Sequence, residues 1–207
     1  MDDALYFITQ LMERGGPVMW PIALCSLITV VVTLRKALQW TFMMLHAQVG
    51  AKMWSDALKT FAQGDKEATL TALKQCHSPY APLLSQALTH PDLPFAEALE
   101  TVARAYVRKL ASGLGILDTI VTLAPMLGIL GTVTGIITSF DLMGSMGTDD
   151  PTGIASGIAE ALITTAAGLI VSIVALIPLN TGRIWHKALT THVENAMTAI
   201  ETAARKA

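Results

Sequence analysis

The stretch from Ile154 to Leu179 reads IASGIAEALITTAAGLIVSIVALIPL, and it includes one ionisable side chain, that of Glu160. A helix that crosses a lipid bilayer needs roughly 20 consecutive, mostly apolar residues. This stretch exceeds that length, so it predicts a transmembrane helix. It also raises the question of what a carboxyl group does inside such a helix.

The rest of the chain is equally apolar in places. Its 207 residues are 52% hydrophobic and only 14% charged, and the mean hydropathy is +0.51. Ordinary soluble domains are more polar than this. Two further apolar stretches, Pro17 to Leu38 and Leu114 to Leu142, are long enough to span a bilayer. The sequence therefore predicts an all-α membrane protein with three transmembrane helices.

The basic residues predict the orientation of the three spans. Of the 14 Lys and Arg residues, only Arg14 precedes the first span, and none lies between the second and third. Cytoplasmic segments carry the excess of Lys and Arg. We therefore expect an outer amino terminus and a cytoplasmic carboxyl terminus. The expected order is an outer N-terminus (1–16), span 17–38, a cytoplasmic helical loop (39–113), span 114–142, an outer hairpin (143–153), span 154–179 and a cytoplasmic helical tail (180–207).

The first span is expected to stay in the mature protein. A secretory signal begins with a basic region and ends at a cleavage site of small residues. This chain instead begins MDDALYF, and its first apolar run is followed by Arg35 and Lys36.

Helical periodicity continues on the cytoplasmic side. Gly64 and Asp65 indicate the end of one helix and the cap of the next, and Pro94 is suited to a first helical turn. One apolar stripe then runs toward the second span with no evident break: Phe95, Leu99, Val102, Tyr106 and Leu110. A second stripe follows the third span: Trp185, Leu189, Val193, Ala196 and Ile200. We expect the second and third spans to extend as long helices far into the cytoplasm.

Such stripes need apolar partners, since a helix with an apolar face is not stable alone in water. The partners are either further copies of the chain or the loop helices of the same chain. A homo-oligomer is the more economical of these two interpretations.

Two of the spans each have a face of small and polar residues. In the third span this face comprises Gly153, Ser156, Gly157, Glu160, Thr164, Ala167, Gly168, Val171, Ser172 and Ala175. In the second span it comprises Asp118, Thr122, Pro125, Gly128, Thr132, Gly135 and Ser139, with Gly131 beside it. Small residues allow close helix packing in membranes. The glycines Gly128, Gly131, Gly135, Gly157 and Gly168 are therefore candidate packing residues.

Glu160 has two interpretations. An ionisable group within a span usually faces a bundle interior or a wet cavity, where it serves a proton or ion path. Alternatively, it is a neutral hydrogen-bonding group that a neighbouring helix satisfies. The hydroxyls of Ser156 and Thr164 lie one helical turn to either side of it.

Other classes of function find little support. No nucleophile with a nearby base, phosphate-binding loop or ligand cluster is evident, so we expect neither an enzyme nor a bound cofactor. Cys25 and Cys76 are expected to be free thiols. The histidines have no metal-site spacing, so we expect no metal: His46, His77, His90, His186 and His192. No nucleic-acid partner is expected.

Three stretches resemble one known family. APMLGILGTVTGI (Ala124–Ile136) followed by GIAEALITTAAGL (Gly157–Leu169) resembles the paired signature of the MotA/TolQ/ExbB proton channel family. GGPVMWPIALCSL (Gly15–Leu27) is similar to the beginning of its short ExbB-type biopolymer transport proteins. The resemblance covers nearly the whole chain, and it places the outer side in the bacterial periplasm.

The resemblance implies a subunit of a complex in the bacterial inner membrane. In that complex a homopentamer surrounds a dimer of an ExbD-like single-span protein, and proton flow drives motion. ExbB-type complexes pass this motion through a TonB-like protein to outer-membrane transport. TolQ-type complexes use it to maintain the envelope, and a non-conducting membrane scaffold is a further alternative.

The resemblance also implies which residues line the pore. The threonine of the GTVxGI motif falls on Thr132, the glutamate of GIAEAL on Glu160, and the threonine before AxGL on Thr165. Thr164 adds a second hydroxyl. Asp118 lies near the cytoplasmic end of the polar stripe, where it is either an exit group or a solvated acid at a helix end.

Overall fold

The chain is all-helical in the computed structural model, which describes residues 12, 15–146 and 151–205. Its helices are α2 (Met19–Ala62), α3 (Lys66–Gln75), α4 (Ala81–Leu88), α5 (Phe95–Ala111), α6 (Leu114–Met146) and α7 (Pro151–Ala204). The predicted all-α class is thus confirmed. Most of the outer N-terminus expected from the sequence, and the tip of the outer hairpin, lie outside the described residues.

Three helical stretches are long and apolar enough to cross a membrane. They lie within Met19–Met43, Phe95–Gly144 and Thr152–Ala204. Large apolar side chains remain exposed along all three, among them Leu24, Ile129 and Ile173. Since water does not favour such a surface and lipid does, the three predicted spans are confirmed as membrane-compatible helices.

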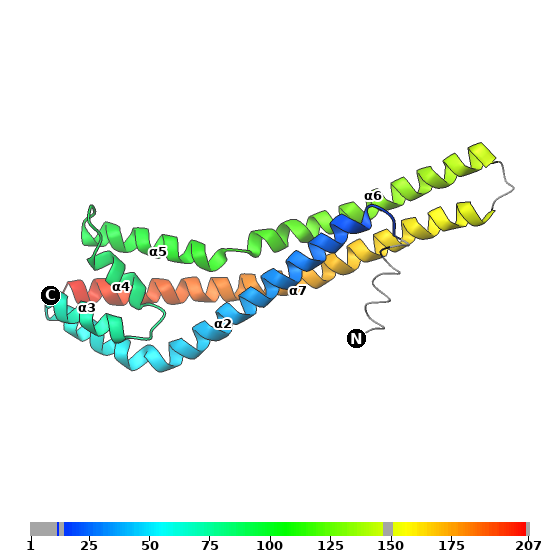
Figure 1. Cartoon of the computed structure of the whole chain (residues 1–207). Helices are drawn as coiled ribbons and strands as arrows, with labels where there is room; N and C mark the ends of the chain where they lie inside the picture. The colour runs from blue at the N-terminus through cyan, green and yellow to red at the C-terminus, as the bar shows by residue number, and fades with distance from the viewer. Residues whose placement is uncertain (1–11, 13–14, 147–150, 206–207) are drawn as a thin grey trace. The chain divides into compact units, whose positions relative to one another are not determined.

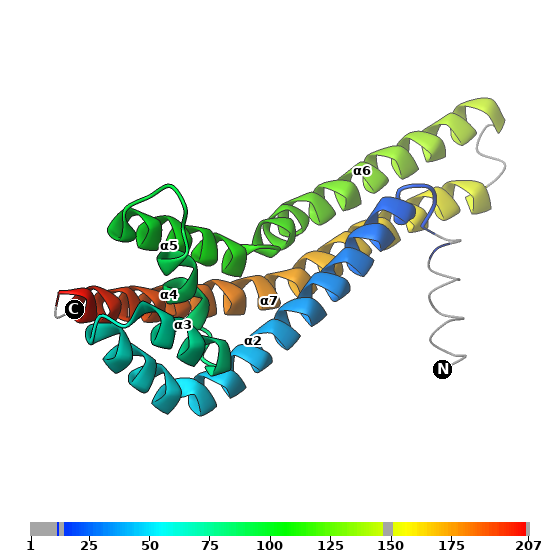
Figure 2. The same cartoon turned by 60° about the vertical axis from the view of Figure 1, so that its left-hand side comes forward.

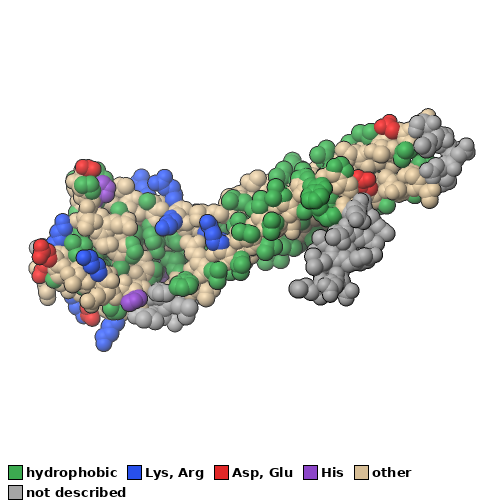
Figure 3. Space-filling model, in the orientation of Figure 1, with side chains coloured by type: hydrophobic (Ala, Val, Ile, Leu, Met, Phe, Trp, Pro, Cys, Tyr) green, Lys and Arg blue, Asp and Glu red, His purple; other side chains and the backbone are tan. Residues whose placement is uncertain are grey.

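The helices divide into two compact units. Residues up to Leu34 and Gly113–Thr181 form one unit, called here the apolar unit. Arg35–Ser112 and Gly182–Ala207 form the other, called here the polar unit. Figure 3 shows hydrophobic side chains spread over the surface of the apolar unit. Every Lys and Arg among the described residues belongs to the polar unit.

In the apolar unit, α6 and the first part of α7 run side by side, and the beginning of α2 lies against them (Figures 1 and 2). Cys25 of α2 is buried in one cluster with Ile120 and Ala124 of α6 and Ala175 of α7. Three helices therefore share one narrow core that is built largely from small side chains.

In the polar unit, α3, α4 and α5 pack with the second part of α2 and the end of α7. Leu83, Leu84 and Leu99 are fully buried in this core, together with Val193 and Ile200 of α7. The buried members of the stripes predicted on α5 and α7 thus pack against helices of the same chain, whereas Val102, Tyr106, Trp185 and Leu189 are half-buried. Packing within the chain therefore accounts for part of both stripes, and the homo-oligomer stays a prediction.

A local sequence signal explains the start of α3 in this unit. Asp65 caps α3, because its carboxylate accepts a hydrogen bond of 2.9 Å from the Ala68 amide. This is the usual role of Asp at the residue before a helix. Pro94 lies at the N-cap of α5, with φ −56° and ψ 149°, rather than inside its first turn as expected.

The helix that approaches the second span is broken, so the expectation of an uninterrupted helix is wrong. Helix α5 ends at Ala111, Ser112 adopts an extended conformation, and Gly113 has φ +90° before α6 begins. A positive φ is easy for glycine and costly for other residues. Ser112 and Gly113 therefore separate the end of α5 from the start of α6 at Leu114.

Two basic side chains of α2 stabilise this break. The ammonium group of Lys36 is buried and donates to the carbonyl of Leu110 at 2.7 Å and to Gln39 Oε1 at 3.2 Å. The guanidinium of Arg35 donates to the Ser112 hydroxyl at 3.2 Å. The last carbonyls of a helix have no partner within that helix, so Lys36 acts as a cap from another helix.

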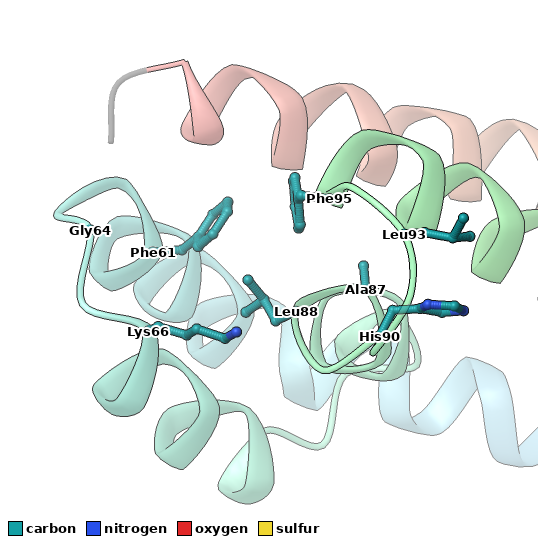
Figure 4. Close-up of a pocket in the computed structure, with 8 residues that line it drawn as sticks. All are labelled: Phe61, Gly64, Lys66, Ala87, Leu88, His90, Leu93 and Phe95. Atoms are coloured by element: carbon teal, nitrogen blue, oxygen red, sulfur yellow. The ribbon is translucent and has the colours of Figure 1, made fainter.

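The polar unit also has a surface cavity of about 400 Å³ between α2, α3, α4 and α5. Figure 4 shows Phe61, Leu88 and Phe95 pointing toward one another, with the Lys66 amine on the same side and the His90 ring turned away. The Phe61 and Phe95 ring centroids are 5.4 Å apart. The lining of the cavity is thus mostly apolar, with Lys66 and His90 as its titratable side chains.

Candidate functional site

Helices α6 and α7 are in close contact in the apolar unit, and glycines make this contact possible. A Cβ built on Gly128 would lie 3.0 Å from Thr165 Cα, and one on Gly135 would lie 2.8 Å from the Gly157 carbonyl oxygen. A Cβ on Gly168 would lie 2.5 Å from the Ala124 carbonyl oxygen. A side chain at these positions would require the opposite backbone to shift, so the two helices lie in close backbone contact along this line.

The remaining two packing glycines contact hydroxyl-bearing side chains. A Cβ on Gly131 would collide with the side chain of Thr164, and one on Gly157 would collide with Ser139 Oγ. The structure thus places all five glycines that the sequence singled out at one helix pair within one chain.

Three hydroxyls tie the same two helices together. Thr165 donates to the Gly128 carbonyl at 2.9 Å, and Ser172 donates to the Val121 carbonyl at 2.7 Å. Ser139 lies close to the Ile154 carbonyl at 3.3 Å, while it also donates to the carbonyl of Gly135 in its own helix at 2.9 Å. In an apolar medium a hydroxyl needs such a partner.

The three threonines expected near the pore take different positions. Thr164 is buried and donates within α7, to the carbonyls of Glu160 and Ala161. Thr165 bridges to α6, as described. Thr132 is half-buried, and its hydroxyl donates to the Ile129 carbonyl of its own helix at 2.6 Å.

Thr165 and Thr132 are nevertheless linked through the backbone. The Gly128 carbonyl that accepts the Thr165 hydroxyl is, in a regular α-helix, also the acceptor for the Thr132 amide. The Thr165 hydroxyl of α7 and the Thr132 amide of α6 therefore both donate to the carbonyl of Gly128.

Glu160 is half-buried on α7, one helical turn before Thr164. Its side chain lies against Gly16, in the turn that precedes α2. A Cβ built on Gly16 would collide with Glu160 Oε1 and would lie 2.6 Å from its carboxyl carbon. The described residues of the apolar unit include no Lys or Arg. Within that unit the carboxyl group thus has no described basic side chain beside it.

Asp118 does not share the helix contact. Asp118 and Thr122 are exposed on α6, whereas Gly128, Gly135 and Ser139 of the same predicted stripe are buried. A stripe that repeats every 3.5 residues drifts by about 20° per seven residues around a straight α-helix. Over its three repeats it therefore leaves the α7 contact, and its end at Asp118 and Thr122 forms a separate polar strip.

The sequence did not indicate that Gly16 would contact Glu160. The stretch Gly15–Gly16–Pro17 is an obvious turn signal, yet periodicity does not reveal which distant side chain such a turn will touch. The positive φ of Gly16, +63°, could have been expected from its sequence context, but its contact with Glu160 could not.

Comparison with known proteins identifies the class. The MotA/TolQ/ExbB proton channel family matches residues 68–201, which include α6, the greater part of α7 and both glycine-rich signatures. The chain belongs to this family, as its resemblance predicted.

Individual relatives are biopolymer transport proteins of the ExbB type. The Synechocystis protein named ExbB-like 1 is 34% identical over 79% of this chain and 66% of its own length. ExbB-like 3 of the same organism is 30% identical, over 82% of this chain and 81% of its own length. The biopolymer transport protein exbB1 of Vibrio cholerae is 26% identical over 93% of this chain and 94% of its own length. The chain thus spans just under two thirds of the first of these relatives.

Proposed function

We propose that this chain is the proton-conducting subunit of an inner-membrane motor. It uses the proton motive force to energise outer-membrane transport through an ExbD-like single-span protein and a TonB-like protein. The relatives named as ExbB-type transport proteins support this role over a TolQ-like one.

One observation carries the proposal, namely the setting of Glu160. A carboxyl group within a membrane segment is expensive unless it faces a polar path or a partner. Glu160 is half-buried, and its own unit has no described Lys or Arg. A carboxyl group in such a segment is one that a proton path or a partner chain would use, and the Thr165 bridge between α6 and α7 lies little more than one turn further along.

The polar strip of α6 supports an assembly around a partner. Asp118, Thr119 and Thr122 are exposed in an otherwise apolar stretch, and lipid would be an unfavourable neighbour for the carboxyl group of Asp118. We infer that this strip faces a pore or another chain. A homopentamer around an ExbD-like dimer provides such a surface, with the amino terminus in the periplasm and the carboxyl terminus in the cytoplasm.

Replacement of Glu160 tests the function. Glu160→Ala should abolish partner-dependent energy transduction, measured as receptor-dependent uptake in cells without their own subunit, while membrane insertion and assembly persist. Glu160→Gln preserves size and most hydrogen bonding, so full activity of this variant would exclude a titrating role. Glu201→Gln, at an exposed site of the polar unit, is the matched control and should behave as wild type.

Stoichiometry is tested separately. Native mass spectrometry of the chain purified with its co-expressed single-span partner should give a complex of five copies with two. A monomer, or a complex that lacks the partner, would contradict the assembly.

A further inference from the structure

The side chain of Glu160 lies directly against Gly16, although the two residues come from distant parts of the chain. The carboxyl group of Glu160 fills the volume that a side chain at position 16 would take, since a Cβ there would lie 2.6 Å from Cδ and 3.4 Å from Cγ. Gly16 also has φ +63°, which L side chains rarely adopt. A side chain at this position would thus strain the backbone, and it would also displace the carboxyl group of Glu160 from its present place.

The turn that includes Gly16 is fixed in place. The amide of Met19 donates to the Gly16 carbonyl at 3.2 Å, and Pro17 restricts φ at the next residue. Just beyond the turn, Met19 and Ile22 are buried in one cluster with Ala167, which lies two turns after Glu160 on α7. The Gly16 backbone is therefore held against Glu160 by the apolar contacts of α2 and does not rest on a loose loop.

We propose that Gly16 is a positioning residue for Glu160. The bare backbone of the turn forms one wall of the carboxyl site, and it holds the side chain of Glu160 in one arrangement on α7. This role rests on the proposed function insofar as the positioned carboxyl group serves proton transfer. The contact itself is independent of that function.

The first test uses the chemical reactivity of the carboxyl group. In native membranes, Glu160 is modified with a hydrophobic carbodiimide, and the modified peptide is quantified by mass spectrometry, with Glu160→Gln as the blank. Gly16→Ala should change the modification rate by about tenfold, because the new methyl group displaces the carboxyl from its site. Unchanged reactivity would show that Gly16 does not hold Glu160, and it would overturn the proposal.

Gly64→Ala is the matched control for backbone strain. Gly64 has φ +80°, but nothing lies within 4 Å of a Cβ built there. It therefore has the same conformational penalty without the collision. Glu160 reactivity should be unchanged in this variant, and an effect equal to that of Gly16→Ala would reduce the role of Gly16 to general stability.

The second test is rescue by a shorter acid. Glu160→Asp withdraws the carboxyl by one methylene group, which makes room for a methyl group at position 16. Gly16→Ala should therefore lower transduction and thermal stability more in the wild-type background than in the Glu160→Asp background, where the collision is relieved and only the strain of the positive φ remains. Additive effects on stability would contradict the contact, even if Glu160→Asp proves inactive in transduction.

The two proposals fail in different ways. If Glu160→Ala transduces normally while the Gly16 tests show coupling, the positioning contact stands and the proton-path function fails. If Glu160→Ala is inactive while the Gly16 tests show no coupling, the function stands and the positioning role fails.

Discussion

The hydroxyl of Thr165 donates to the main-chain carbonyl of Gly128 at 2.9 Å, whereas the adjacent Thr164 donates only to carbonyls of its own helix. Neighbouring threonines in one signature thus serve different purposes. Thr165 joins α7 to α6, and Thr164 fills the space opposite Gly131.

This difference predicts unequal effects of two near-isosteric substitutions. Thr165→Val should remove about 0.6 kcal/mol of helix association, a typical value for a hydrogen bond between membrane helices, and should reduce transduction with little loss of assembly. Thr164→Val keeps the shape that packs on Gly131 and should be milder in both respects. Uptake assays and thermal unfolding in detergent measure these effects, and a Thr164→Val defect as large as that of Thr165→Val would contradict the assignment.

Gly131 and Gly115 provide a matched pair of helical glycines on α6. Gly131→Ala forces a methyl group into Thr164 and should cost about 1 to 3 kcal/mol of stability. Gly115 has nothing within 4 Å of its built Cβ, so Gly115→Ala should be neutral or stabilising by about 0.5 to 1 kcal/mol through helix propensity. Thermal unfolding of the purified protein should rank Gly115→Ala above wild type and Gly131→Ala below it. The opposite order would show that α6 and α7 do not meet at Gly131.

Lys36 should contribute more to the stability of the polar unit than the exposed basic residue Lys109 does. Lys36→Met removes the hydrogen bond to the buried Leu110 carbonyl and should destabilise the polar unit by about 1.5 to 3 kcal/mol, the usual range for a charged donor. Limited proteolysis should then cleave near Ser112 and Gly113 more readily. Lys109 is exposed, and Lys109→Met should leave both stability and cleavage unchanged. Equal effects of the two variants would exclude a specific cap.

Orientation is open to a direct labelling test. In a variant without Cys25 and Cys76, a cysteine at Thr148 should react with an impermeant reagent from the periplasm, and one at Lys66 should not. This expectation follows from the excess of basic residues in the polar unit. Labelling at Lys66 alone would reverse the topology.

The helix pair of the candidate site was largely predictable from the sequence, because glycine spacing is a local pattern that directly reflects close helix packing. Gly128, Gly135 and Gly157 illustrate this directness, since each touches the other helix. The position of Asp118 was not predictable in the same way. Counting in steps of three and four residues assigns Asp118 and Gly135 to one face of the helix. Such a face turns gradually around a straight α-helix, so the two residues point in different directions.

The break between α5 and α6 had a sequence signal that the apolar stripe concealed. Ser112 and Gly113 resemble a helix end, since glycine with positive φ commonly follows a helix. Leu110 and Leu114 flank them, however, and continue an apolar periodicity. The contact between Gly16 and Glu160 had no such signal, because it joins residues far apart in the chain and depends on the packing of α2 against α7.

The bond between Lys36 and Leu110 also has a consequence for the order of folding. A chain is synthesised from its amino terminus, so the ammonium group of Lys36 exists before the carbonyl that it binds, which follows 74 residues later. Helix α5 can therefore receive this cap only once its last turn exists, by which time the donor is already part of the chain. Both partners of the bond thus precede the second apolar helix in synthesis.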